Sequence, residues 1–348
     1  MVFSATPLSG MPMPQPGGSG AMTGVMWHPS LPPTFARLIT WHPQPVPILP
    51  AIAGVLLVVY LVGIVVLRRR GVRWPIQRTI WWTAGIVTVL LVTATGVDGY
   101  GMELFSVHMV QHMVLSMLSP IFLVLGAPIT LLLRVLPARH GGGWNPRKLV
   151  LLILHSRVAA FFTHPGVTVT LFLVSLYGLY FTPVFDILMS TMWGHNLMLI
   201  HFLLIGLLYF WGVMGVDPSP RKAYRGIRAL SSPVLRILEM VVTVPFHAFF
   251  GVVVMMSVDL IVRFYAHPNP AWHLSALGDQ QVGGGIAWGF TELPTLVVLG
   301  ILFWQWQSTA ARHDRAADRK ADSDGDAERL AYNARLRTLA AHDQARGL

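Results

Sequence analysis

Long apolar runs separated by short polar and basic segments make up most of this 348-residue chain. A helix needs roughly 20 apolar residues to cross about 30 Å of hydrocarbon. The pattern predicts seven such helices, at 47–67, 79–97, 104–133, 167–185, 195–216, 233–262 and 283–307. The third and sixth runs are longer than a crossing requires, so Pro120, Pro128 and Pro245 are expected to bend them. We therefore predict an all-α, polytopic membrane protein built as a bundle of seven transmembrane helices.

Lys and Arg residues indicate the side of the membrane on which each loop lies, because short basic loops are retained in the cytoplasm. Basic clusters follow the first, third and fifth predicted helices: Arg68, Arg69, Arg70, Arg73 and Arg78; Arg134, Arg139, Arg147, Lys148 and Arg157; Arg221, Lys222, Arg225, Arg228 and Arg236. At the opposite ends of the helices, the only Lys or Arg residues are Arg37 and Arg263. The pattern predicts an N-terminus outside the cytoplasm and a cytoplasmic C-terminus.

Composition agrees with a membrane protein: 54% of the residues are hydrophobic, 11% are charged and the mean hydropathy is +0.58. The net charge of +10 comes largely from the basic loops, where topology and anionic lipid headgroups account for it, so nucleic-acid binding is not expected. Three segments surround or interrupt the transmembrane domain, 47–307. Residues 1–46, rich in Met, Pro and Gly, are predicted to be disordered and extracytoplasmic. Residues 308–348 form a charged cytoplasmic tail, and 148–162 suit an interfacial helix.

Polar residues inside the predicted helices are the functional candidates, because they are costly in hydrocarbon. His108 and His112 stand four positions apart, on one face of the third helix and about 6 Å from each other, so they could share one metal ion. The alternative is a pair of histidines bonded to backbone or water. His195, Met198 and His201 form a band on the fifth helix, in which Met198 falls midway in angle between the two histidines.

The sixth and seventh helices add further candidates. His247 lies near mid-membrane on the sixth helix, where a ligand and an interhelical hydrogen-bonding residue are equally compatible with the pattern. Asp279 and Gln280 belong to a polar, glycine-rich segment at the outer ends of the histidine helices, and Glu292 is ionisable within the seventh helix. No acid–base pair or nucleophile stands out in the loops, so no catalytic turnover is expected.

Copper is the metal that these residue types favour. The chain has 16 methionines and no cysteine, and imidazole together with thioether suits Cu(I), a soft ion that accepts few ligands. The four histidines of the third and fifth helices all fall within the first turns of helices that run inward. The predicted site therefore faces outward.

Several segments of this sequence resemble the seven-span CtaG family of cytochrome c oxidase assembly factors. They are His108-Met-Val-Gln-His112 with Ser119-Pro120 and Leu125-Gly-Ala-Pro128, His195 to His201 with Tyr209-Phe-Trp-Gly-Val-Met-Gly-Val-Asp-Pro218, His247-Ala-Phe-Phe-Gly251, and Asp279-Gln-Gln-Val-Gly-Gly. Together they cover roughly residues 50 to 307. The resemblance implies a protein of the bacterial inner (plasma) membrane.

The resemblance further implies a role in activating a haem-copper oxidase, by aiding copper insertion into its catalytic subunit after receipt from extracytoplasmic copper carriers. Three other functions stay open on the sequence. A copper transporter or copper-resistance protein would use similar ligands, although these thin out below His247. A haem-binding electron carrier could use His112 and His201 from different helices. An assembly scaffold would need no metal.

Overall fold

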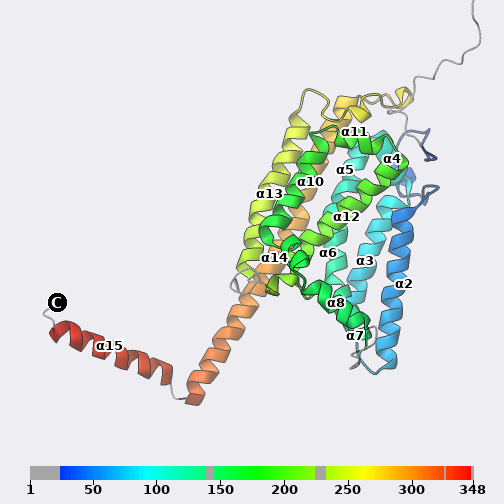
Figure 1. Ribbon diagram of the computed structural model, residues 1–348. Coiled ribbons are helices and arrows are strands. Elements are labelled where there is room, and N and C mark those ends of the chain that lie inside the picture. The colour runs from blue at the N-terminus through cyan, green and yellow to red at the C-terminus, as the bar shows by residue number, and fades with distance from the viewer. Residues whose placement is uncertain (1–23, 138–144, 224–232, 325–326, 346–348) are drawn as a thin grey trace, which may run out of the picture. The chain divides into compact units, whose positions relative to one another are not determined.

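Helices dominate the described part of the chain, residues 24–137, 145–223, 233–324 and 327–345 of this computed structural model (Figure 1). The chain forms two compact units, residues 1–296 and 297–348. The first unit contains α1 (Phe35–Ile39), α2 (Ile48–Arg69), α3 (Ile76–Thr93), α4 (Gly96–Glu103), α5 (Phe105–Met113), the π-helix Val114–Leu118, α6 (Ser119–Leu125), α7 (Pro128–Val135), α8 (Pro146–Leu154), α9 (Arg157–Phe162), α10 (Pro165–Tyr180), α11 (Val184–Met189), α12 (Met192–Met214) and α13 (Pro233–Met256). Helix α14 (Ala276–Asp324) begins in the first unit and continues in the second, which also holds α15 (Ala327–Ala345).

Six helical stretches are long and apolar enough to cross a membrane: Ile48–Arg69, Ile76–Thr93, Phe105–Val135, Met192–Met214, Val234–Met256 and Ala276–Ser308. Each coincides with a predicted helix. The predicted fourth helix, 167–185, is α10, which has only 16 residues. Such a helix rises about 24 Å, less than the hydrocarbon thickness. Its end follows from Pro183, since the residue before a proline disfavours helical geometry.

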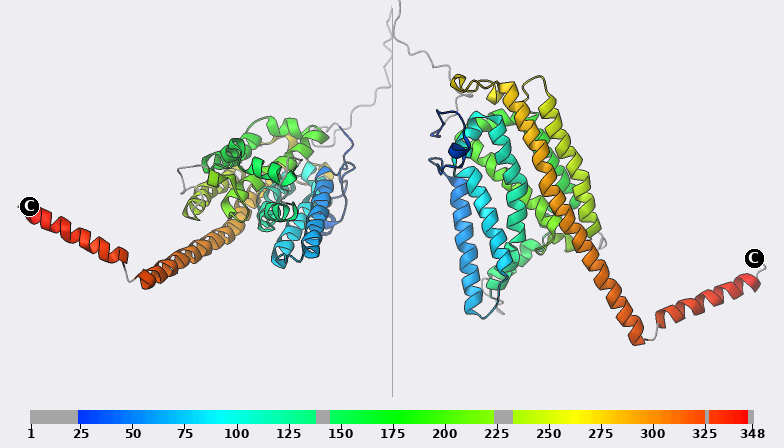
Figure 2. Two further views of the ribbon diagram at one scale, coloured as in Figure 1. Left: turned by 60° about the horizontal axis from the view of Figure 1, so that its bottom comes forward. Right: turned by 180° about the vertical axis from the view of Figure 1, so that it is seen from behind.

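Neighbouring helices of the first unit run side by side. Contacts join α2 to α3, α3 to α6, α6 to α12, and α12 to both α10 and α13. Figures 1 and 2 show α2 at one side of this group and α13 at the other. In the most apolar stretch of Phe105–Val135, 67% of the residues are buried, whereas 28% are buried in the most apolar stretch of α2. The third predicted helix is therefore central, while α2 exposes apolar residues to the bilayer.

The central helix is interrupted at both prolines that the sequence singled out. The π-helix Val114–Leu118 precedes Pro120. Ala127 adopts a left-handed conformation, with φ of 51°, immediately before Pro128. Both breaks follow from proline, which lacks an N–H and restricts the residue before it. Pro245 lies inside α13 without ending it.

Part of the Met/Pro/Gly-rich segment packs on the first unit. Residues 1–23, including the Met11-Pro-Met13 stretch, lie outside the described residues. In the following segment, the backbone N–H of His42 donates to Ala94 O at 2.9 Å, and that of Gly96 donates to Thr40 O at 3.0 Å. The Tyr100 hydroxyl donates to Leu31 O at 2.8 Å. These contacts join residues far apart in the sequence, so the composition of 1–46 does not reveal them.

The basic loop after the central helix is helical where it is described. Two short helices, α8 and α9, occupy most of the stretch 148–162, where a single interfacial helix was predicted. Exposed apolar side chains accompany its basic residues, among them Leu152 and Phe161. Such a mixture suits a helix lying at a membrane surface.

Candidate functional site

Two buried histidines from different helices face a common space in the first unit. His112 of α5 is 3% exposed and His247 of α13 is 1% exposed, and their ring centres are 6.4 Å apart. None of the four ring nitrogens has a hydrogen-bond partner among the described residues. A buried polar atom without a partner costs about 1–3 kcal/mol. The pair of rings, called here the histidine pair, therefore carries a free-energy cost that a ligand bound to its nitrogens would remove.

A small cavity adjoins both rings. Its volume is about 10 Å³, and it is lined by His112, Ser116, Phe172, Ser175, Leu176, Phe202, Ile205 and His247. A space of roughly this size holds about one water molecule. The site thus has room for a single water or a single ion, and not for an organic cofactor.

The π-helix directly after His112 has an identifiable cause. Pro120 has no N–H, and its ring crowds the carbonyl four residues earlier, which belongs to Ser116. The Ser116 hydroxyl donates to His112 O at 2.7 Å. Gly206 of α12 lies against this region, because a Cβ there would overlap Ser116 O and stand 2.6 Å from Pro120 Cγ. Pro120 and Gly206 together fix the backbone from which His112 extends. π-Helical turns often accompany functional sites.

His108 lies beside the histidine pair and shares its neighbours. Its Nε2 is 3.0 Å from the Tyr180 hydroxyl, and its Nδ1 has no partner among the described residues. The Tyr180 and Phe202 rings contact both His108 and His112. One nitrogen of His108 is thus already engaged, whereas both nitrogens of His112 are available.

The two histidines of α12 have different surroundings. His201 Nε2 is 2.6 Å from Ser175 Oγ, and Ser175 lines the small cavity. His201 therefore reaches the site through one hydroxyl group. His195 Nε2 is 3.3 Å from Asp98 Oδ1, and its Nδ1 is 3.3 Å from Met189 Sδ.

Asp98 is the centre of a separate buried group. Besides its contact with His195, it accepts a hydrogen bond of 2.6 Å from Gln111 Nε2, which also donates to Val92 O. Asp98, Gln111 and Tyr180 were not singled out from the sequence. For Asp98 the available signal was its place as an acid directly after an apolar run. Met198 is buried on the same helix as His195, with 1% of its surface exposed.

The remaining polar candidates hold backbone rather than line the cavity. The Asp279 carboxylate accepts from the N–H of Phe105 at 2.6 Å and from the N–H and hydroxyl of Ser106, so it caps the helix that carries His108 and His112. Gln280 accepts from Ile261 N at 2.7 Å and donates to Asp259 O at 3.1 Å. The Glu292 side chain is exposed. Asp279 thus positions a helix end, and Gln280 positions the loop after α13.

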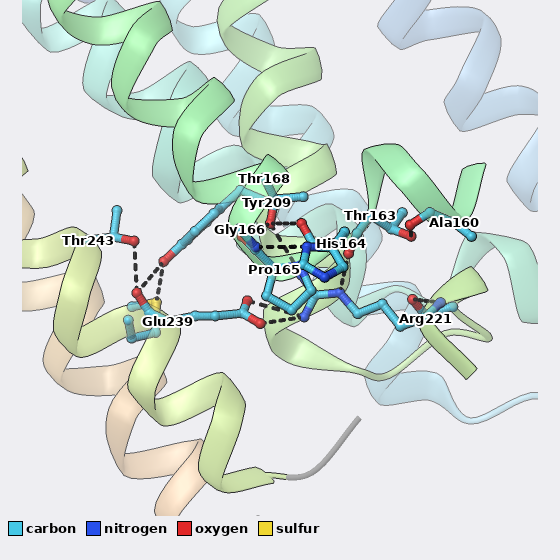
Figure 3. Close-up of polar contacts among 12 residues, drawn as sticks. Ala160, Thr163, His164, Pro165, Gly166, Thr168, Tyr209, Arg221, Glu239 and Thr243 are labelled. Carbon is cyan, nitrogen blue, oxygen red and sulfur yellow. Dashed lines mark hydrogen bonds and ion pairs between the residues drawn. The ribbon is translucent and has the colours of Figure 1, made fainter. Parts of the chain in front are cut away.

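A second buried polar group is an ion pair with its surrounding donors and acceptors (Figure 3). Arg221 Nη1 lies 2.8 Å and 3.1 Å from the two carboxylate oxygens of Glu239. Arg221 Nε donates to Thr163 O at 2.5 Å, and Nη2 donates to Thr168 Oγ1 at 3.3 Å. This group, called here the ion-pair cluster, joins the segment after α12 to α13 and to the start of α10.

The donor set limits the metals that the site could take. Within the described residues no three His, Asp or Glu side chains lie close enough to hold an ion together. Two imidazoles on opposite sides of one metal ion have ring centres about 6–6.5 Å apart, from metal–nitrogen bonds of about 2 Å. The histidine pair matches that spacing. A two-coordinate ion such as Cu(I) therefore fits these side chains better than tetrahedral Zn²⁺.

The six apolar helices and the buried histidines define a polytopic helical membrane protein with a polar site inside the bundle. Comparison with known families agrees: residues 58–309 match the family described as cytochrome c oxidase caa3 assembly factor (Caa3_CtaG). The chain belongs to this family, as its motifs predicted.

Curated relatives come from mycobacteria. The uncharacterized protein Mb0105 of Mycobacterium bovis is 44% identical over 315 residues, which cover 88% of this chain and 46% of the relative. The uncharacterized protein ML1998 of Mycobacterium leprae is 42% identical over 313 residues, with the same coverage. This chain therefore spans less than half the length of these relatives. No solved structure matches the chain.

Proposed function

We propose that this protein helps to assemble a haem-copper cytochrome c oxidase by binding one Cu(I) ion between His112 and His247 and passing it toward the catalytic subunit of the oxidase. The observation that carries the proposal is the pair of buried rings, 6.4 Å apart, whose four nitrogens have no partners among the described residues. The oxidase in the proposal comes from the description of the family to which the chain belongs, which is a cytochrome c oxidase assembly factor. Copper is the cargo in this proposal.

Low coordination suits a delivery site. An ion held by two imidazoles leaves positions open to an incoming ligand, so a partner can take it by ligand exchange. His108, and His201 through Ser175, stand next to the pair and offer intermediate ligands. His112 lies seven residues into α5, about 10 Å from its start, so the route to that end of the bundle is short.

A haem carrier is less compatible with this geometry. Two axial histidines must leave room between them for a porphyrin, and the cavity beside the histidine pair is only about 10 Å³. A copper transporter stays as the alternative function. It would need ligands continuing to the other end of the bundle, where the ion-pair cluster engages the buried charges.

Copper retention tests the proposal. Purified protein is loaded with Cu(I) under anaerobic conditions and desalted, and His112→Leu and His247→Leu variants are treated alike. One copper per chain is expected in the parent protein and a loss of most of it in either variant. The exposed His267→Leu serves as the matched control. Equal copper in all four proteins would refute the site.

A cellular assay separates delivery from transport. The same variants replace the native copy in the source organism, and oxidase activity is compared with total cell copper. Delivery predicts inactive oxidase at unchanged cell copper. A changed cell copper content that accounts for the oxidase defect would favour transport.

We also propose that α10 crosses the membrane as a seventh span, with the N-terminus outside and the C-terminus in the cytoplasm. The basic clusters at alternate ends of the helices support this orientation. Because the chain has no cysteine, a single introduced cysteine reports its own side of the membrane. Ser30→Cys is expected to react with an impermeant maleimide in intact cells, and Ser323→Cys only after lysis. The opposite labelling would invert the topology.

A further inference from the structure

A large pocket lies in the first unit, away from the histidine pair. Its volume is about 640 Å³, within the range of small-molecule sites. It lies between α3, α7, α8 and the segment 215–220. The lining residues are Arg78, Thr130, Leu133, Leu151, Leu154, His155, Gly215, Val216, Asp217, Pro218, Ser219 and Pro220.

One arginine, Arg78, lines this pocket. The guanidinium carbon of Arg78 lies 5.1 Å from the centre of the Trp74 ring, and that of Arg134 lies 5.7 Å from it. The Arg78 side chain makes no hydrogen bond or salt bridge with a described residue, so its five donors are available. Arg70 lies at the same end of the bundle, where its Nη1 donates to Val135 O at 2.6 Å. The pocket therefore presents donors suited to an anion.

The acid in the lining is already engaged. The Asp217 carboxylate accepts from the N–H of Ile129 at 3.1 Å and from the N–H and hydroxyl of Thr130 at 2.9 Å and 2.5 Å. It thus accepts hydrogen bonds from backbone N–H groups in the first turn of α7, which have no acceptor within the helix. Burial raises the pKa of Asp217, and the hydrogen bonds from Thr130 and Ile129, together with the positive charge of Arg78, oppose that rise. Its lone pairs are directed at α7, which makes a cation site in this pocket a poor fit.

His155 has one ring nitrogen that the structure leaves open. Its Nδ1 lies 2.6 Å from Leu151 O and must carry the proton of that hydrogen bond. The other nitrogen, Nε2, has no hydrogen-bond partner among the described residues and is an acceptor in the neutral ring, so the contact with an anion rests on Arg78.

The rest of the lining is apolar and continues onto a surface suited to lipid. Leu133, Leu151 and Leu154 line the pocket. The neighbouring Leu152 and Ile153 of α8 are 68% and 57% exposed. Exposed leucines beside Arg147 and Lys148 are typical of a helix at the membrane interface. A ligand here would have an anionic group at Arg78 and hydrocarbon along the leucines.

We propose that this pocket binds the phosphodiester headgroup of an anionic membrane phospholipid. Arg78 binds the phosphate, and the leucine wall contacts the first carbons of the acyl chains. Basic pockets between membrane helices on the positively charged side are suited to anionic headgroups. The site is independent of copper.

Lipid binding to the purified full chain tests the proposal. Native mass spectrometry in detergent compares dioleoylphosphatidylglycerol with dioleoylphosphatidylcholine. We expect the anionic lipid to bind at least about fivefold more tightly, which is the effect of one cation near an anionic lipid. In Arg78→Gln this preference should fall to less than about twofold.

The control is Arg69→Gln, which removes the same charge from an exposed site at the same end of the bundle and should keep the preference. Leu133→Glu places a carboxylate in the pocket wall without altering Arg78 and should abolish the preference, so the test does not depend on one variant. An unchanged preference in Arg78→Gln and Leu133→Glu would overturn the proposal. Competition by millimolar inorganic phosphate would also overturn it, because free phosphate would then be the ligand.

Discussion

The ion-pair cluster and the histidine pair are both buried among the helices of the first unit, and they differ in how fully their polar atoms are paired. Arg221 and Glu239 satisfy each other and the neighbouring Thr163 and Thr168. The four nitrogens of His112 and His247 have no partner among the described residues. The four side chains are buried to a similar degree, so the pairing of their polar atoms distinguishes the two groups.

The difference separates two uses of a buried polar residue. A fully paired group stabilises one arrangement of helices, because removing one partner leaves the other as a buried charge without a counter-charge. An unpaired group lowers stability and is retained where it binds something. The ion-pair cluster is accordingly interpreted as structural and the histidine pair as a binding site. Each interpretation gives an effect of different size when a single side chain is changed.

The largest effect is expected at the ion-pair cluster. Glu239→Leu leaves the buried Arg221 without its carboxylate, which should cost about 3–5 kcal/mol in the free energy of unfolding. Thermal unfolding in detergent measures the loss. The double variant Arg221→Met/Glu239→Leu removes both charges and should recover most of it. If the single variant is as stable as the parent protein, the cluster is not structural.

A smaller effect is expected where α12 meets the π-helix. In Gly206→Ala the added Cβ overlaps Ser116 O, so α12 must shift, at a cost of about 1–3 kcal/mol. Copper retention should also fall, because the shift moves His112. Gly54→Ala is the matched control, since a Cβ added at Gly54 would have no other atom within 4 Å. Parent-like stability and copper binding in Gly206→Ala would contradict this role of the contact.

The smallest effect on stability is expected at the histidine pair. His247→Leu replaces an unpaired imidazole by an apolar side chain of similar size, so the free energy of unfolding should change by less than about 1 kcal/mol. Copper binding, in contrast, should be lost. A destabilisation as large as that of Glu239→Leu would mean that the ring has a structural partner, and the comparison between the two groups would fail.

Much of the fold follows from simple rules of length and hydropathy. Six apolar stretches, and the breaks near Pro120 and Pro128, were predictable because proline acts locally on the backbone. The length of α10 was predicted incorrectly, since 167–185 counts apolar residues beyond the stop at Pro183. The order of contacts between helices has no comparable local signal.

The candidate site was predictable only in part. The residue types on α5, α12 and α13 indicated a histidine site, and His112 and His247 do lie together. That His201 bonds Ser175, that His195 bonds Asp98, and that Glu239 pairs with Arg221 depend on tertiary packing. Periodicity places a residue on a helix face, but it does not identify the side chain opposite. The metal-sharing His108 and His112 arrangement and the bound copper stay predictions.

The π-helix Val114–Leu118 makes the number of residues in this stretch as important as their identity. A π-turn contains one residue more than the α-helical register, so deleting a single residue between His112 and Pro120 would give a regular helix. Residues after that deletion would keep their present faces, because the π-turn already absorbs the extra residue, whereas a second deletion would rotate them by about 100° relative to His112. Homologous chains should therefore tolerate the loss of one residue in this stretch, but not the loss of a second one.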